Sequence, residues 1–173
     1  EHADAITALP VDGVAVFPAD TAFSAEWRKK ASGRRSIDFA LNGPAAVSGT
    51  LLKNGTLEIK TSNGVINVRL SVLGEHNLRN ALAATAVALA AKVDLEAIRL
   101  GLESFQAVSG RMMAKQLGTC LLIDDSYNAN PDSVRAAIDA LSQASQKTCL
   151  VLGDMGEVGS KGPEFHYEVG AYA

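Results

Sequence analysis

The sequence predicts an α/β protein in which an antiparallel meander and two helices precede a parallel strand–helix–strand unit. Two short apolar runs, at 120–123 and 149–152, flank a stretch with helical spacing, as is typical of buried parallel strands joined by a helix. Residues 45–73 contain runs of strand-forming residues separated by turn signals, and 81–91 is mostly alanine. These three observations fix the predicted fold class.

Composition excludes several classes of protein. The chain has 173 residues, of which 47% are hydrophobic and 20% charged, as in a folded soluble protein of one domain or two small ones. The net charge is -3 and the runs of basic residues are short, so no nucleic-acid partner is expected. No apolar stretch is long enough to span a membrane. The two cysteines, Cys120 and Cys149, fall in the predicted buried strands. We interpret them as core residues of a cytoplasmic protein.

The first third of the chain predicts local elements without obvious chemistry. Residues 1–12 are interpreted as the end of a helix and a loop, residues 13–18 as a buried strand, and residues 22–31 as a helix. Phe23 and Trp27 lie one turn apart on that helix, which predicts a core anchor.

Four strands are then expected, joined as an antiparallel meander. Asn54-Gly55 and Asn63-Gly64 are strong hairpin turns, because both residue types tolerate a positive φ. Strict alternation from Ile66 to Val72 predicts a strand with one buried face. The predicted strands cover 36–41, 45–52, 56–61 and 65–73.

A long helix is predicted from about residue 74 to residue 91, with Asn77 and Asn80 on one face near its start. Two carboxamides there could read the donor and acceptor edges of a heterocycle; alternatively, Asn77 merely caps the helix. Asp94 is expected to cap the next helix. The buried stripe of that helix is predicted to be Leu95, Ile98, Leu102 and Phe105.

Ser109-Gly110-Arg111 separates two sequence patterns, so we place a domain boundary there, with domains at 1–108 and 109–173. Arg111 is then either a cleft residue or an ordinary surface arginine.

Polar residues gather where the two predicted parallel strands end, which is where ligands bind in such sheets. Asn130 can cap the following helix, with Pro131 at its first position. The sequence contains no phosphate-loop motif, zinc-ligand spacing or serine-hydrolase elbow. From the residues alone we predict a site for a nucleotide or another anion, built from Asp124, Asp125, Ser126, Asn128, Asn130 and Asp154.

Four segments together resemble the Mur ligase family. Residues 74–84 are similar to its H-N-x-x-N-A-x-A-A helix, and Gly110-Arg111 to its glycine–arginine step. Residues 124–133 resemble the members that add D-alanyl-D-alanine, rather than the diaminopimelate-adding or lysine-adding enzymes or the folylpolyglutamate synthases. Residues 153–159, with His166 and Gly170, are similar to the same members.

The resemblance implies ATP-dependent addition of D-alanyl-D-alanine to a UDP-N-acetylmuramoyl-tripeptide in peptidoglycan synthesis, by a monomeric cytoplasmic ligase with no nucleic-acid or membrane partner. It implies nucleotide contacts from His76, Asn77, Asn80, Arg111 and Asp125, with Arg111 as the catalytic group. It implies a substrate face formed by Ser126, Tyr127, Asn128, Asn130, Asp154 and His166.

The same resemblance places the family's phosphate loop, Mg²⁺ ligands and modified lysine upstream of Glu1. The chain is therefore expected to be an internal, inactive piece: the later part of the central ATP-binding domain and the start of a Rossmann-like C-terminal domain. Self-association or partial disorder after about residue 153 is expected. Residues 18–21 depart from the family's asparagine–x–aspartate–aspartate run, which puts a nucleotide role for Asp20 in doubt.

Two alternatives remain open at this point. One is another Mur ligase or a folylpolyglutamate-type ligase, which keeps the chemistry and changes the substrate. The other is an α/β module that binds a nucleotide or a partner without catalysis.

Overall fold

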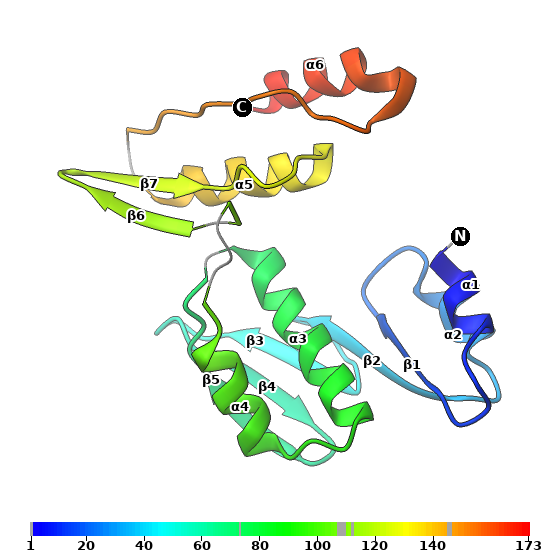
Figure 1. Ribbon diagram of the computed structural model, residues 1–173. Helices are drawn as coiled ribbons and strands as arrows, with labels where there is room; N and C mark the ends of the chain where they lie inside the picture. Colours follow the sequence, from blue (N-terminus) through cyan, green and yellow to red (C-terminus); the bar gives the residue numbers. More distant parts are fainter. Residues whose placement is uncertain (1, 73, 107–109, 112, 145–146) are drawn as a thin grey trace. The chain divides into compact units, whose positions relative to one another are not determined.

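The computed structural model describes all residues except 1, 73, 107–109, 112 and 145–146, and it divides into two compact units (Figure 1). The first comprises Glu1–Ser71 and Asn77–Phe105, and the second comprises Val72–His76 and Gln106–Ala173. The expected boundary between 108 and 109 lies outside the described residues. No helix in the described part of the chain is long and apolar enough to cross a membrane.

A five-stranded mixed sheet forms the centre of the first unit (Figure 1). Its strands lie in sequence order; β1 pairs with β2 and β2 with β3 in parallel, whereas β3–β4 and β4–β5 are antiparallel. The strands are β1 (Val14–Pro18), β2 (Arg35–Leu41), β3 (Val47–Leu51), β4 (Leu57–Thr61) and β5 (Gly64–Val68).

The predicted antiparallel meander is therefore correct from β3 onward and wrong for β2. Residues 42–46 turn the chain so that β3 runs parallel to β2, with Phe39 opposite Val47. Asn42 adopts a left-handed conformation with φ 58° in this turn. The Asp38 carboxylate accepts a hydrogen bond from the Ala46 N–H at 2.8 Å, which fixes the end of the turn against β2. Such a short parallel connection is rare, and the hairpin signals that marked the other turns are missing here.

Helices α1 (His2–Thr7) and α2 (Ser24–Lys30) flank β1 and enclose a small core. Ile6, Ala15, Phe17 and Ala31 are buried there, with Trp27 packed against them. The expected core pair is only half right, because Phe23 is 62% exposed although its ring lies 6.0 Å from that of Trp27.

Helix α3 (Glu75–Ala90) packs directly on the sheet. Leu82 and Ala86 are fully buried, and a Cβ atom on Gly49 of β3 would lie 2.7 Å from a Leu82 methyl group. The helix begins at Glu75, so Asn77 lies in its first turn and is not its cap.

Helix α4 (Leu95–Ser104) begins as predicted, because the Asp94 carboxylate accepts the Ala97 N–H at 3.0 Å. Ile98 is buried, and Leu95 and Leu102 pack against the core. The stripe stops short of Phe105, which is 50% exposed because it follows the last helical residue in an extended conformation.

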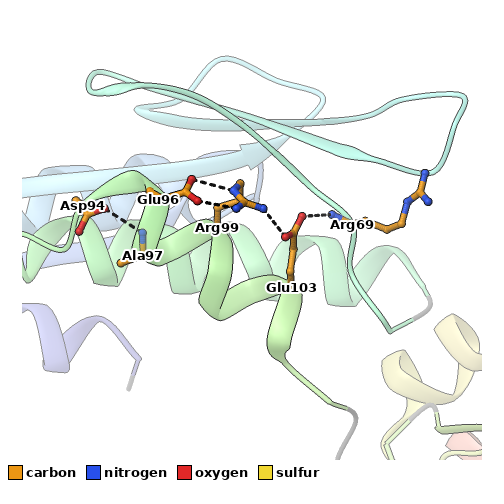
Figure 2. A network of polar contacts seen from close by, with 6 residues as sticks. All are labelled: Arg69, Asp94, Glu96, Ala97, Arg99 and Glu103. Atoms are coloured by element: carbon orange, nitrogen blue, oxygen red, sulfur yellow. Dashed lines mark hydrogen bonds and ion pairs between the residues drawn. The ribbon is translucent and has the colours of Figure 1, made fainter.

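A polar network on α4 ends strand β5 (Figure 2). Arg99 bonds Glu96 at 2.6 Å and Glu103 at 2.5 Å, and the second oxygen of Glu103 accepts the Arg69 N–H at 3.5 Å. The hydrogen bond from Arg99 lowers the pKa of Glu96. The Arg69 amide bonds a side chain instead of a strand, and β5 stops at Val68. The expected extension of the strand is not formed at 69–72, and residue 73 lies outside the described residues.

Asp20 has a structural role in the first unit. Its Oδ2 accepts the Arg79 guanidinium at 2.7 Å and the Leu41 N–H at 3.3 Å, and so joins the loop after β1 to β2 and α3. This geometry accounts for the carboxylate without any ligand.

The second unit contains the hairpin β6 (Met113–Leu117) and β7 (Cys120–Asp124), α5 (Pro131–Ala144), a 3₁₀ turn η1 (Gly159–Lys161) and α6 (Gly162–Tyr172). Val134, Ile138, Met155 and Val169 form its core. Arg135 pairs with Glu168 at 2.8 Å and the Tyr172 hydroxyl donates to Asp139 at 2.9 Å, so polar contacts also join α5 to α6.

The predicted second parallel strand is wrong in this structure. Residues 149–152 adopt no regular secondary structure, and the β7 strand pairs only with β6 among the strands described. A strand requires a neighbouring strand for its backbone hydrogen bonds. Among the described strands none pairs with residues 149–152, and their apolar side chains remain exposed to solvent, as Val151 shows with 87% exposure. Cys120 and Cys149 are exposed as well, contrary to their expected burial.

Replacing Gly49 by alanine should lower the free energy of unfolding of the first unit by about 1–3 kcal/mol, because the added methyl overlaps Leu82. Gly101→Ala on α4 is the matched control, since no atom lies within 4 Å of its Cβ position. That change should raise stability by about 0.5–1 kcal/mol. Chemical denaturation measures both changes. Equal stability of Gly49→Ala and the unsubstituted protein would contradict the close packing of Leu82 against Gly49.

The Asp38 carboxylate should make the first unit more stable at neutral than at acid pH. Burial raises its pKa, but the Ala46 N–H and Arg28 outweigh this effect and hold the pKa below its usual value. A lowered pKa gives stability that is present above the ordinary value of about 3.9 and is lost as pH falls through the folded-state value.

Asp38→Asn should therefore cost about 1–3 kcal/mol at pH 7 and weaken the fall in stability between pH 5 and 2. The exposed Asp12→Asn variant is the control. Denaturation curves measured between pH 5 and 2 test this prediction. If stability falls with pH as steeply in Asp38→Asn as in the unsubstituted protein, the lowered pKa of Asp38 does not contribute to stability.

Candidate functional site

The candidate site begins where β7 ends, in a turn built by its own side chains. Asp124 Oδ1 accepts both the Ser126 hydroxyl at 2.7 Å and the Ser126 N–H at 3.2 Å. The hydroxyl bond is the main reason why the pKa of Asp124 lies below its usual value. Asp124 is thus an ionised carboxylate that closes the turn, and Asp125 follows it in the chain.

The next residues lead into α5 through a reciprocal cap. The Asn130 side-chain oxygen accepts the Ser133 N–H at 2.9 Å, and the Ser133 hydroxyl accepts the Asn130 N–H at 3.0 Å. Pro131 occupies the first helical position, as predicted. The Asn128 side-chain oxygen accepts the Ala129 N–H at 2.9 Å, so its amide nitrogen remains a donor.

A pocket of about 1010 Å³ lies within the second unit. The end of β7, its turn, α5, residues 149–156 and α6 surround it, with apolar side chains on its walls. Seven of the predicted site residues line it together: Asp124, Asp125, Ser126, Tyr127, Asn128, Asp154 and His166. Asn130 and Arg111 are not among its lining residues.

His166 uses both ring nitrogens on the backbone. Its Nε2 accepts the Met155 N–H at 2.9 Å, and its Nδ1 lies 2.7 Å from the Gly162 carbonyl oxygen. An acceptor at Nε2 and a carbonyl at Nδ1 require the neutral tautomer with the proton on Nδ1. The imidazole therefore fixes residues 153–159, the glycine-rich loop, to α6. Its Nε2 also lies 3.8 Å from Oδ1 of Asp154, whose side chain is fully exposed.

Arg111 lies over the ring of Tyr127, with its guanidinium carbon 4.2 Å from the ring centroid. The Tyr127 N–H donates to the Gly110 carbonyl at 2.9 Å, so backbone and side-chain contacts join the same two segments. The arginine side chain is exposed.

The three predicted nucleotide residues near the start of α3 lie within two turns of helix. Asn77 is partly exposed and Asn80 is exposed. His76 Nδ1 is buried and has no hydrogen-bond partner among the described residues. His76 and Asn80 are four residues apart and therefore lie on one face of α3.

No group of three histidine, cysteine or acidic side chains in the described residues could hold a metal ion. Mg²⁺ in nucleotide sites is usually held by one or two carboxylates together with water and phosphate oxygens, so a group of three such side chains is not required for it.

Met155 is a supporting residue of the site that no sequence motif marked as such. Its side chain is buried in the core of the second unit and its amide is the His166 partner. A lone methionine in a glycine-rich loop was the available signal, since apolar residues in such loops often anchor them.

Replacing His166 by alanine should release the loop, because the Met155 N–H and the Gly162 carbonyl would lose their partner. We expect a loss of about 1–3 kcal/mol in the stability of the second unit and faster hydrogen exchange at the Met155 amide. The neighbouring Tyr167→Ala, whose side chain is 80% exposed, should leave both unchanged. Unaltered protection of the Met155 amide in His166→Ala would contradict this role.

Comparison with known proteins places both parts of the chain in one family. Residues 4–88 match the Mur ligase middle domain, and residues 110–173 match the glutamate ligase domain of Mur ligases. The UDP-N-acetylmuramoyl-tripeptide–D-alanyl-D-alanine ligase of Escherichia coli K12 is 36% identical over 95% of this chain. The ligase of the same name from Haemophilus influenzae is 37% identical over 95%.

Solved structures agree with these matches. A crystal structure of MurF from Acinetobacter baumannii superposes with a TM-score of 0.88 and 38% identity, over 97% of this chain and 38% of that one. MurF from Thermotoga maritima in complex with ADP gives a TM-score of 0.80 and 25% identity, over 96% of this chain and 39% of that one. The chain spans 38% and 36% of the lengths of the two curated relatives. By sequence, by fold and by the residues gathered at the end of β7, the chain belongs to the Mur ligase family.

Proposed function

We propose that the protein is an ATP-dependent ligase that adds D-alanyl-D-alanine to a UDP-N-acetylmuramoyl-tripeptide in peptidoglycan synthesis. The observation that carries this proposal is the likeness to ligases of that name, at 36% and 37% identity over 95% of the chain. The pocket at the end of β7 adds to it, because it is lined by the residues 124–129 that carry the resemblance to these members.

The chemistry requires activation of a carboxylate, which is a poor electrophile in its ionised form. Transfer of the γ-phosphoryl group of ATP to the peptide carboxylate gives an acyl phosphate and ADP. The amine of D-alanyl-D-alanine then attacks the acyl carbon; an amide bond forms, the C–O bond to phosphate breaks, and the amine loses a proton. Both steps concentrate negative charge, so fixed cationic groups and N–H donors accelerate them.

For the nucleotide we propose two sets of residues. On α3, His76, Asn77 and Asn80 face the adenine; the unpartnered His76 nitrogen and the exposed Asn80 support this assignment. In the second unit, Asp125 binds the ribose hydroxyls and Arg111 is the catalytic group that meets the γ-phosphate. The likeness to a ligase solved with ADP supports a nucleotide as the ligand.

For the peptide substrates we propose the residues that line the pocket. Ser126, Tyr127 and Asn128 form one side, and the exposed Asp154 offers a carboxylate to the amine of the dipeptide. Asn130 and His166 belong to the same site through the elements they fix, namely the start of α5 and the glycine-rich loop.

We further propose that the ligase uses Mg²⁺, acts as a monomer and works in the cytoplasm, where ATP and nucleotide-linked precursors are made.

The proposal is tested on the complete ligase polypeptide by phosphate release with ATP, UDP-N-acetylmuramoyl-tripeptide and D-alanyl-D-alanine. Turnover should require the dipeptide and should fail with diaminopimelate, lysine or glutamate in its place. Arg111→Ala should lower kcat by roughly 10²–10³, the usual effect of removing one donor to a developing negative charge. Lys53→Ala, in the β3–β4 turn, should leave kcat unchanged. Turnover with one of the other amino acids would replace the proposed substrate.

A further inference from the structure

We propose that Tyr127 is a positioning residue, which holds the Arg111 guanidinium in place by stacking while leaving its N–H donors free for an anion. This inference rests on the proposed function, because it gives a reason for the orientation of the proposed phosphate-binding arginine. It assigns Tyr127 a role through Arg111, in addition to its place on the pocket wall.

The backbone brings the two residues together. Gly110 adopts φ +75°, and its carbonyl accepts the Tyr127 N–H at 2.9 Å. A Cβ atom on Gly110 would lie 2.9 Å from that same nitrogen, so only glycine allows so close an approach. Arg111 therefore leaves the backbone from a point fixed against the turn after β7.

The two side chains form a cation–π contact, with the Arg111 guanidinium over the Tyr127 ring. The Arg111 guanidinium carbon lies 4.2 Å from the Tyr127 ring centroid, well within the range of a cation–π contact. The guanidinium carbon lies over the ring, and the five N–H donors of an arginine lie in the guanidinium plane, directed away from its central carbon. Stacking thus limits the rotamers of a long side chain without occupying the groups that would bind phosphate.

A second arginine in the same unit shows the contrast. Arg135 is held by carboxylates, at 3.3 Å from Asp132 and 2.8 Å from Glu168. Such pairing uses the N–H donors and offsets the positive charge, which suits a structural arginine. An arginine that must present its full charge to a phosphate is better held by a neutral ring.

The surroundings favour access by a ligand. The Tyr127 side chain is 64% exposed and Arg111 is exposed, so neither is buried as part of a core. A cation–π contact at such an exposed site corresponds to a factor of about two to five in an equilibrium constant. This factor sets the size of the effect expected from losing the ring.

The test compares Tyr127→Phe, which keeps the ring, with Tyr127→Leu, which removes it. In NMR spectra of this chain, the Arg111 Hδ protons should show a ring-current shift that persists in Tyr127→Phe and disappears in Tyr127→Leu. In the complete ligase, Tyr127→Leu should lower kcat about two- to five-fold, and Tyr127→Phe should keep kcat within about two-fold of the unsubstituted ligase.

A double-mutant cycle separates positioning from a direct role. In an Arg111→Ala background, Tyr127→Leu should have no further effect on kcat, since Tyr127 acts through Arg111. Equal losses in the Phe and Leu variants, or a full additive loss in the Arg111→Ala background, would overturn the proposal in favour of direct substrate contact. Absence of the ring-current shift in the unsubstituted chain would overturn it as well. Failure of the unsubstituted ligase to turn over would reject the proposed function alone, because the NMR measurement requires no reaction.

Discussion

The arrangement of the second unit depends on one close backbone contact, between Gly110 and the turn after β7. The carbonyl of Gly110 accepts the Tyr127 N–H, and the missing Cβ of the glycine makes this approach possible. Because the contact fixes the turn and the arginine step together, Arg111 reaches the Tyr127 ring and the following residues are aimed into the pocket. A larger residue at Gly110 would disturb the strand end, the arginine and the pocket wall at once.

Several polar side chains in the segments that resemble the Mur ligases stabilise the fold of the second unit. Asp124 closes the turn on Ser126, Asn130 caps α5, and His166 holds the glycine-rich loop through two backbone groups. In the first unit, Asp20 is likewise paired with Arg79. A site built from short polar turns needs such support, because a catalytic or binding side chain is only as well placed as the backbone that carries it. Family resemblance at a position therefore does not distinguish a ligand contact from a supporting one.

The exposed apolar residues of the second unit reflect the same dependence on neighbours. Leu121, Leu122 and residues 150–152 are apolar enough for a buried sheet, yet they remain at least partly exposed where no described strand pairs with residues 149–152. Periodicity reports what a segment could bury, whereas burial requires a partner surface. The same distinction explains Phe23 and Phe105, which have the right spacing for a core but lie at the ends of their helices.

The sequence by itself determined the α/β class, the positions of the helices, the caps at Asp94 and Asn130 and the gathering of polar residues after β7. These features depend on local propensity and on spacing within one element, which the order of residues records directly. Only the tertiary structure decided that β2 runs parallel to β3, that residues 149–152 form no strand, and that Asp20 pairs with Arg79. It also decided that Arg111 stacks on Tyr127, 16 residues later in the chain. Each of these depends on contacts between residues distant in sequence, and no local pattern specifies which distant partner a backbone amide or a charged side chain will meet.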